Sequence, residues 1–380
     1  MKKNDTFFSR TDTKIIKGLA IILMLMHHLW AFPERIAGGE LKPFITIGGK
    51  NTLIFFGEFG KICVSIFFFV GGYGIYKLSE KKDFNILENI KKMFIKYWKI
   101  FLIFIPIGFI FFNNQIAYCE NELIYSMYSN ISIRNLLKNF FGISSSLNRE
   151  WWFFHSYLIA IITFPFIKKL FDNKSTIFNL FIIIVYTLLV TNVLPAIGKI
   201  EIIGSLNNNI IYKEFFLQKS PYISCFWMGI LFSKDNLLLE LKNKINEIVK
   251  LNPLFDIIGI LIIVYFRQIV FGETYDMIYL PFLIILFLDF VSKFKLLKKI
   301  FELFGNHSTN MWLTHSFFCY YFYYFVKIVV YFKWGVPCLF VLTILSLLAS
   351  YGINYFWKFI NIIVSFIKKQ KSQIFRHCKQ

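Results

Sequence analysis

Residues 14–32 read KIIKGLAIILMLMHHLWAF, an apolar run with two lysines near its start and two adjacent histidines near its end. A run of this length can cross a bilayer as a single helix. No small-residue cleavage site follows it, so we expect a retained transmembrane helix rather than a cleavable signal peptide. The run decides the fold class, because stretches of the same kind recur along the rest of the chain.

These apolar runs predict an all-α, polytopic membrane protein with about ten transmembrane helices. The expected spans are 14–32, 54–76, 94–112, 151–170, 177–195, 214–232, 254–271, 276–292, 308–330 and 336–366. Of the 380 residues, 57% are hydrophobic and only 17% are charged, against about 25% in a soluble domain. A water-soluble globule is thereby excluded. We expect one integral-membrane domain over 1–380, ending in a short basic cytoplasmic tail at 367–380.

The formal net charge of +20, from 42 Lys and Arg against 22 Asp and Glu, is distributed unevenly between alternate loops. One set of loops, together with both termini, holds 29 of the 42 basic residues. Because Lys and Arg accumulate in cytoplasmic loops, this bias predicts that both termini are cytoplasmic. The basic clusters then anchor the protein at anionic headgroups, and binding to nucleic acid is disfavoured. The six cysteines lack CxxC or Cys/His spacing, so we expect no metal site.

The first helix carries the sharpest candidate for chemistry, in Lys17 and His28. Eleven residues at about 100° each return to the same face within roughly 20°, about 16 Å further along the axis. His27 points about 80° away from Lys17 on the same geometry. An imidazole deep in the membrane can act as a general base on a hydroxyl, since it titrates near neutral pH. The alternative is an adjacent histidine pair that is hydrogen-bonded near the outer interface.

Lys17, ten intervening residues and then His28 resemble the Arg-x10-His motif in the first helix of the membrane acyltransferase-3 family. Three later segments also resemble family segments: 65–73 (SIFFFVGGY), 150–153 (EWWF) and 305–315 (GNHSTNMWLTH). Their order covers nearly the whole chain. Two positions depart from the pattern. Lys17 keeps the charge of arginine but loses its bidentate fork, and Gly71 stands where the family has serine, so that hydroxyl is absent or moved to Ser65.

The resemblance implies a bacterial O-acyltransferase of the plasma membrane. Such an enzyme moves an acyl group, expected to be acetyl, from cytoplasmic acyl-CoA to a hydroxyl of an extracytoplasmic polysaccharide or glycolipid. No permanently bound cofactor is implied beyond the donor, acetyl-CoA or another acyl-CoA. His28 and Lys17 would be the catalytic residues, and Lys17 and Lys14 would face the donor phosphates. Direct transfer is preferred, with a relay through an acyl-histidine left open; no Gly-x-Ser-x-Gly elbow is present.

Four further residues are candidates for binding the acceptor: Glu150, Trp151, Trp152 and His315. The first three open the fourth expected helix at its outer rim, where aromatic rings suit stacking on a sugar. An interfacial aromatic belt is the alternative for the two tryptophans. His315 lies about two turns into the ninth expected helix, where it would orient His28, bind substrate or simply be a satisfied interior histidine.

Other intramembrane charges have structural interpretations. Glu58 and Lys61 are i,i+3 neighbours and are expected to pair with each other near the outer rim. Asp256 and Asp289 lie at inner helix ends and are expected to form structural ion pairs.

Three rival functions remain open. A transporter or lipid-linked sugar flippase would show inverted repeats and matched broken helices, and the sequence shows neither. A glycosyltransferase that uses a lipid-phosphate sugar would want acidic residues in the first outer loop; Glu34 and Glu40 are there, without metal-ligand spacing. A membrane acyltransferase of another class, acting on lipids or proteins, would share the donor but not the first-helix motif.

Overall fold

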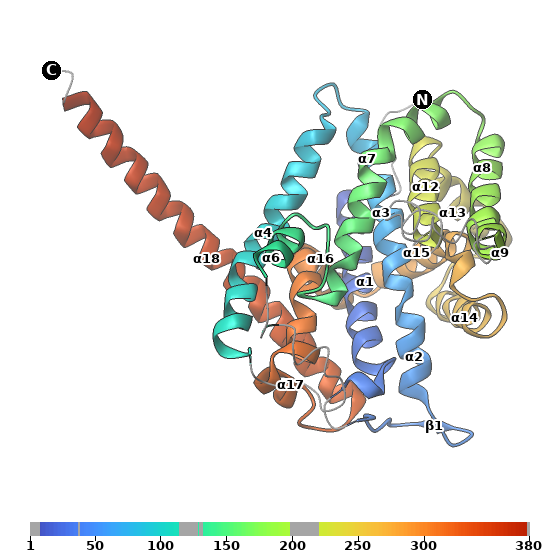
Figure 1. Cartoon of the computed structure of the whole chain (residues 1–380). Helices are drawn as coiled ribbons and strands as arrows, with labels where there is room; N and C mark the ends of the chain where they lie inside the picture. The colour runs from blue at the N-terminus through green and yellow to red at the C-terminus, as the bar shows by residue number, and fades with distance from the viewer. Residues whose placement is uncertain (1–7, 37–38, 114–127, 129–131, 198–219, 378–380) are drawn as a thin grey trace.

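The computed structural model describes residues 8–36, 39–113, 128, 132–197 and 220–377, and these residues form a bundle of helices (Figure 1). The sheet within this part of the chain is a single hairpin of β1 (Thr46–Ile47) and β2 (Lys50–Asn51). The prediction of an all-α membrane protein is therefore confirmed.

The bundle is built mainly from long helices, interrupted by single turns of 3₁₀- or π-helix. The helices are α1 (Arg10–Trp30), α2 (Thr52–Gly60), α3 (Ile62–Ser79), α4 (Ile86–Phe111), α6 (Ile133–Phe140), α7 (Trp152–Asp172), α8 (Thr176–Leu188), α9 (Leu194–Ile197), α12 (Ser220–Lys234), α13 (Leu237–Ile248), α14 (Pro253–Tyr265), α15 (Asp276–Ser292), α16 (Lys295–Ser316), α17 (Tyr323–Val329) and α18 (Gly335–His377). The single turns are η1 (Pro33–Arg35), η2 (Arg149–Trp151), η3 (Leu189–Val193), η6 (Phe266–Phe271), η7 (Glu273–Tyr275) and η8 (Phe317–Tyr321).

Within the described ranges, eight helical segments are long and apolar enough to cross a membrane. They match eight of the ten expected spans, and the expected span 214–232 begins outside the described residues. The expected single helix over 308–330 is wrong. It consists of the end of α16, the π-helical turn η8, an extended Phe322 and the short α17. The total of ten spans stays a prediction.

Glycines allow the central helices to approach each other closely. A Cβ on Gly18 of α1 would lie 2.0 Å from a backbone oxygen of α16, and one on Gly305 of α16 would lie 1.8 Å from a backbone oxygen of α1. The pair α3 and α12 uses the same device, with Gly72 and Gly229 each placing a Cβ 2.0 Å from backbone oxygen of the other helix. Small residues at such crossings let helix backbones pack tightly inside a membrane. α1 is thereby held against α16.

The expected ion pairs at the inner helix ends are confirmed. The ammonium of Lys293 lies 3.2 Å from a carboxylate oxygen of Asp256 and also pairs with Asp289. One lysine thus joins the start of α14 to the end of α15.

The expected pair between Glu58 and Lys61 is wrong. Lys61 instead pairs with Glu273 of η7, with 2.8 Å between Nζ and Oε2. Less than one turn of helix separates Glu58 from Lys61. Lys61, however, lies at the junction of α2 and α3, and its ammonium reaches the neighbouring segment instead.

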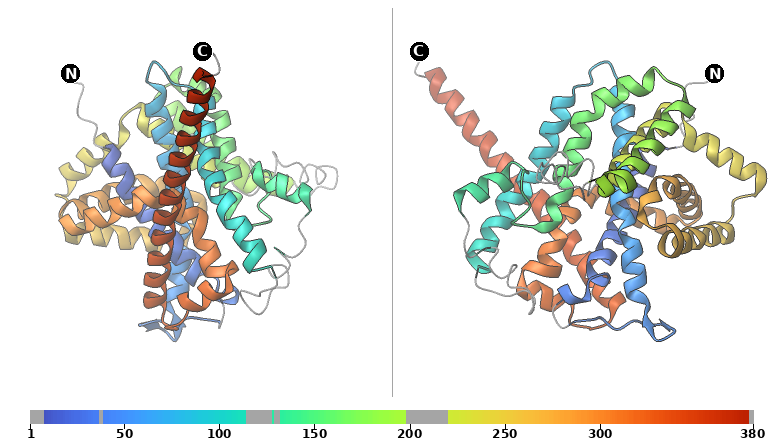
Figure 2. Two further views of the ribbon diagram at one scale, coloured as in Figure 1. Left: turned by 90° about the vertical axis from the view of Figure 1, so that its left-hand side faces the viewer. Right: turned by 45° about the vertical axis from the view of Figure 1, so that its right-hand side comes forward.

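The start of α1 and the end of α18 lie toward the same side of the bundle, opposite the β1–β2 hairpin (Figure 1). This arrangement agrees with the prediction that both termini share one side, while their cytoplasmic location stays a prediction. α18 continues as a helix into the predicted tail, to His377, and its C-terminal half extends beyond the other helices (Figures 1 and 2).

Candidate active site

His28 lies near the C-terminal end of α1, between residues of α16 and η8. Its ring centroid is 4.8 Å from that of His315. The hydroxyl of Tyr320 lies 3.4 Å from His28 Nδ1 and donates a hydrogen bond to the backbone oxygen of His28. The π-helical turn after Ser316 widens the helix at this point and carries Tyr320 back toward α1. Two residues from late in the chain, His315 and Tyr320, therefore contact the predicted catalytic histidine.

His27 is held in a different way. Its Nδ1 lies 2.9 Å from the carbonyl oxygen of Gly57 in α2, and its ring centroid is 5.1 Å from that of His28. Nδ1 must carry the proton in that hydrogen bond, because a carbonyl oxygen only accepts. The helix-face argument separates His27 from Lys17, yet both histidines border the same cavity.

His315 is fully buried beside His28. Its Nδ1 lies 2.6 Å from the carbonyl oxygen of Trp312, which makes Nδ1 the protonated nitrogen. Within the described part of the chain, its Nε2 has no hydrogen-bond partner. The sequence left three roles open for His315, one of them orienting His28, and the structure brings the two rings together.

A second polar cluster, of Arg35, Glu150 and Tyr321, lies next to the histidines. Arg35 Nη2 is 2.6 Å from Glu150 Oε1, and the Tyr321 hydroxyl donates to the other carboxylate oxygen. The guanidinium carbon of Arg35 also lies 3.9 Å from the ring centroid of Tyr320. Burial alone would lower the pKa of Arg35, but the neighbouring Tyr320 and Glu150 raise it above its usual value. Arg35 is therefore a partly buried, permanently charged cation that holds the buried Glu150 in place.

His27, His28, Arg35 and Glu150 line a cavity of about 360 Å³, which we call the outer cavity, while His315, Tyr320 and Tyr321 lie outside its lining. Its polar lining comprises His27 and His28, the two ion pairs of Arg35 with Glu150 and of Lys61 with Glu273, and Arg149. The remaining lining is mostly aromatic. The lining residues are Met24, His27, His28, Phe32, Arg35, Lys61, Cys63, Val64, Phe67, Arg149, Glu150, Trp152, Phe153, Tyr222, Glu273 and Trp312.

A second cavity of about 350 Å³, the inner cavity, lies further toward the start of α1. Lys17, Lys92 and Lys96 line it, and no carboxylate of a described residue does. Its other walls are mainly apolar side chains of α3, α4, α7 and α16. The inner cavity thus combines an apolar channel with three lysines, of which Lys92 also pairs with Glu88, with 2.8 Å between Nζ and Oε1.

The two cavities share three lining residues: Phe67, Phe153 and Trp312. The rings of Phe153 and Trp312 pack edge to face with centroids 4.8 Å apart, and those of Phe67 and Phe153 with centroids 5.9 Å apart. We call these three residues the aromatic partition. Lys17 lies on one side of it and His28 on the other, so the α1 motif spans both cavities.

Not every predicted site residue lines a cavity. Lys14 pairs with Glu302 at 3.7 Å and lies outside both cavities. Trp151 is buried, and its indole N–H donates to the carbonyl oxygen of Leu313 at 2.9 Å. Trp152 and Glu150 do line the outer cavity.

The glycine at position 71, where the resembled family has serine, has a physical reason. A Cβ on Gly71 would lie 2.3 Å from the hydroxyl oxygen of Tyr157, so a serine at position 71 would displace that ring. Ser65 is buried, and its hydroxyl donates to a carboxylate oxygen of Asp276 at 2.6 Å. Asp276 in turn is paired with the buried Arg267, with 2.6 Å between Oδ1 and Nε. Ser65 lines neither cavity, so it does not supply the missing hydroxyl there.

The sequence interpretation missed Arg35, Tyr320 and Tyr321. Arg35 had one usable signal, because it is the only arginine in the first expected outer loop. The tyrosines had none, because their positions depend on the π-helical turn. Within the described ranges, no group of three or more His, Cys, Asp or Glu could hold a metal ion.

A family model described as an acyltransferase domain, Acyl_transf_3, matches residues 12–365. The matched region covers nearly the whole chain and includes α1, the aromatic partition and both cavities. No curated protein and no solved structure matches the chain.

Proposed function

The chain belongs to the acyltransferase-3 family and is a membrane acyltransferase, and from that premise we propose that it moves an acetyl group from cytoplasmic acetyl-CoA to a hydroxyl of an extracytoplasmic polysaccharide or glycolipid. The observation that carries the proposal is the pair of cavities that meet at the aromatic partition. Lys17 lines the one that lies toward the predicted cytoplasmic side, and His28 lines the other.

The inner cavity fits the arm of the donor. Its apolar walls suit a long, thin chain, and Lys17, Lys92 and Lys96 supply positive charge for the phosphate end. The thioester at the tip of the arm would pass between the rings of the partition to reach His28. Lys17 would therefore serve in donor binding, while Lys14, paired with Glu302, would contribute only at longer range.

The chemistry assigned to His28 is general base catalysis. The Tyr320 hydroxyl donates its proton to the His28 backbone oxygen, so its own oxygen can accept from Nδ1–H. That tautomer leaves Nε2 as the base. Nε2 would take the proton of the acceptor hydroxyl as its oxygen attacks the thioester carbonyl. The carbon–sulfur bond then breaks, the thiolate takes the proton from the imidazolium, and ester and free CoA result.

The outer cavity fits a polar acceptor. Glu150 presents carboxylate oxygens to hydroxyl groups, and Trp152 offers an aromatic face for a sugar ring. Arg35 and Lys61 line the same cavity as cations and favour the negative charge that develops on the carbonyl oxygen. His315 would position the ring of His28 through direct contact.

The test compares bacteria that lack the native gene and carry wild type, His28→Ala, His27→Ala or His155→Ala. The measured quantity is the base-labile acetate released from surface glycans, normalised to the amount of membrane protein. We expect His28→Ala to lower it about 100-fold or more. His155→Ala is the matched control, since His155 lines neither cavity.

Full acetate release from His28→Ala at normal protein levels would overturn the assignment of the base. Equal loss in His27→Ala and His28→Ala would mean that the two rings act together. A strain that lacks the protein and fails to export glycan, rather than failing to acetylate it, would favour the transporter alternative.

A further inference from the structure

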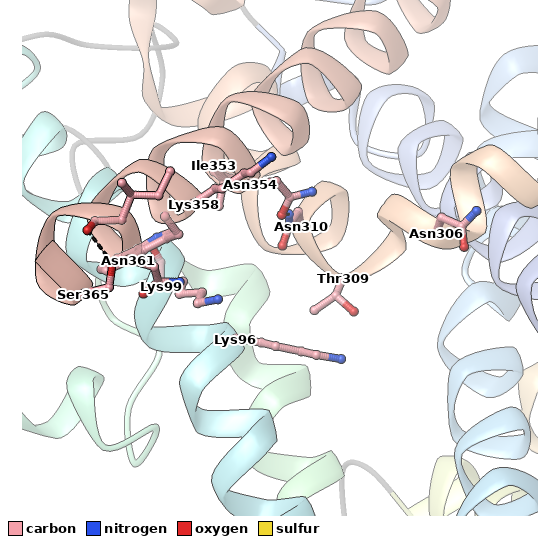
Figure 3. Close-up of a pocket in the computed structure, with 12 residues that line it drawn as sticks. Lys96, Lys99, Asn306, Thr309, Asn310, Ile353, Asn354, Lys358, Asn361 and Ser365 are labelled. Carbon is pink, nitrogen blue, oxygen red and sulfur yellow. Dashed lines mark hydrogen bonds between the residues drawn. The ribbon is translucent and has the colours of Figure 1, made fainter. Parts of the chain in front are cut away.

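A third cavity of about 570 Å³ opens between α4, α16 and α18 (Figure 3). We call it the lysine groove. Its lining is almost wholly polar: three lysines, four asparagines, a threonine and a serine, with a tryptophan and two isoleucines. These residues are Lys96, Lys99, Asn306, Thr309, Asn310, Ile353, Asn354, Trp357, Lys358, Asn361, Ile362 and Ser365.

The groove has positive charge without compensation. Within the part of the chain that the structure describes, no carboxylate lines it, and none of Lys96, Lys99 and Lys358 pairs with a carboxylate. Besides the three ammonium groups, the lining contains the N–H donors of the asparagine side chains. Cations and N–H donors together are the groups that bind phosphate oxygens. The lining therefore selects an anionic ligand, and phosphate esters fit it.

The groove is held in shape by a contact between two of its walls. The indole N–H of Trp357 in α18 donates to the carbonyl oxygen of Lys99 in α4, at 3.0 Å. Asn310 of α16 donates to the side-chain oxygen of Asn354 of α18, at 3.1 Å. These bonds tie the three helices together and keep Lys358, the neighbour of Trp357, on the same side as Lys99.

The groove adjoins the inner cavity. Lys96 and Thr309 line both, and Figure 3 shows their side chains projecting into the same space. A ligand with its phosphates in the groove could extend a chain through the inner cavity toward the aromatic partition. An anionic lipid would instead keep its acyl chains in the bilayer. The position of the groove beside the inner cavity, with Lys96 and Thr309 common to both linings, therefore favours a ligand with one long arm.

We propose that the lysine groove binds the phosphate groups at the nucleotide end of the acyl-CoA donor. The groove, the inner cavity and the outer cavity then hold the nucleotide, the arm and the acyl group in series. The assignment rests on the proposed function, because that function supplies the donor.

The test measures CoA binding to the full chain in zwitterionic lipid nanodiscs. The variant is Lys99→Gln with Lys358→Gln, and the matched control is Lys81→Gln with Lys82→Gln. The control pair lies in the same predicted cytoplasmic region and outside the groove. We expect the groove variant to bind CoA about tenfold more weakly or worse, because it loses two charge-assisted contacts. The control should bind as wild type does. Lys99→Arg with Lys358→Arg should retain most of the affinity.

Two further probes identify the part of the ligand that is held. Adenosine 3′,5′-bisphosphate should compete with CoA for binding to wild type and should lose that ability on the glutamine variant. Pantetheine, which lacks the nucleotide, should compete equally well on both proteins. Unchanged CoA affinity in a folded glutamine variant would overturn the groove and leave the proposed function standing. Absence of CoA binding to wild type would overturn both.

A further experiment with lipid distinguishes the two possible sources of phosphate, CoA and an anionic lipid headgroup. The same proteins are purified from membranes rich in phosphatidylglycerol, and the retained lipid is counted by native mass spectrometry. Loss of retained phosphatidylglycerol in the glutamine variant, with CoA affinity unchanged, would assign the groove to a lipid headgroup and overturn the proposal.

Discussion

His28 draws its environment from residues that lie far away in the sequence. Tyr320 and His315 reach it from the far end of the chain, and Arg35 lies over the ring of Tyr320. A lone histidine in a helix could be a satisfied core residue. Here it lines a cavity, faces a second histidine and is braced by a tyrosine, which is the setting that a positioned general base requires.

The contact between the Tyr320 hydroxyl and His28 gives the first prediction. Tyr320→Phe removes the hydroxyl beside Nδ1 and should lower the rate of acyl transfer roughly 3- to 10-fold, the range of a single lost hydrogen bond. The loss should fall on turnover rather than on donor affinity, and the pH dependence of the rate should change. Tyr323→Phe is the control, because Tyr323 lines none of the cavities. Wild-type turnover in Tyr320→Phe would remove Tyr320 from the mechanism.

The ion pair of Arg35 and Glu150 gives the second prediction. Arg35→Met leaves the buried carboxylate of Glu150 without its partner, and Glu150→Leu leaves the partly buried guanidinium of Arg35 without its partner. Each change should lower the free energy of unfolding by about 3 kcal/mol. The double variant should lose less than the sum of the two single losses, since neither charge then remains. Thermal unfolding in detergent measures all four proteins. Strictly additive losses would show that the pair is not coupled.

At the scale of the helices, glycine contacts determine which pairs can come together. Gly18 and Gly305 bring α1 and α16 into backbone contact, and these two helices carry residues of all three cavities. The alignment of Lys17, the partition and His28 depends on that contact.

Gly305→Ala tests the contact directly. Its Cβ would lie 1.8 Å from a backbone oxygen of α1, which cannot move without shifting the helix. We expect a marked loss of monodisperse protein after detergent extraction. Gly352→Ala in α18 is the control, because nothing lies within 4 Å of its Cβ position. That change should be neutral or slightly stabilising, as alanine favours helix. Equal yields from the two variants would contradict the packing argument.

The sequence could predict the helices better than the site. Apolar runs mark membrane helices because length and hydrophobicity are local properties. The π-helical turn within 308–330 could not be predicted from the sequence, because a change of hydrogen-bond register leaves no signal in the composition. The pairs of Arg35 with Glu150 and Lys61 with Glu273 also escaped, because they join positions 115 and 212 apart in the chain. Lys17 and His28 could be proposed as site residues from the sequence because both lie on one helix, where spacing gives direction; their roles stay a prediction.

At the scale of the whole molecule, the lysine groove, the inner cavity and the outer cavity follow one another along α16. Successive cavities share residues, with Lys96 and Thr309 at the first junction and the aromatic partition at the second. The hydrophobic helices thus surround a series of adjoining cavities that is polar at both ends and mainly apolar in the middle, with the aromatic partition between the inner and outer cavities.

The partition should also act as a seal. Trp312→Ala removes the largest of its three rings and should join the inner and outer cavities into one wetted path. We expect proteoliposomes of this variant to leak protons several-fold faster than wild type, as reported by a trapped pH-sensitive dye. Trp334→Ala, near the β1–β2 hairpin, should leave the leak unchanged. An unaltered leak in Trp312→Ala would show that other residues close the path.

The most direct test of transfer across the membrane uses vesicles of defined orientation. Radiolabelled acetyl-CoA, which does not cross a bilayer, is added to inverted and to right-side-out membrane vesicles that contain wild type or His28→Ala. The quantity measured is base-labile label on glycan. We predict labelling only in inverted vesicles of wild type, where the predicted cytoplasmic side faces the donor. Equal labelling in right-side-out vesicles, or labelling by His28→Ala, would contradict it.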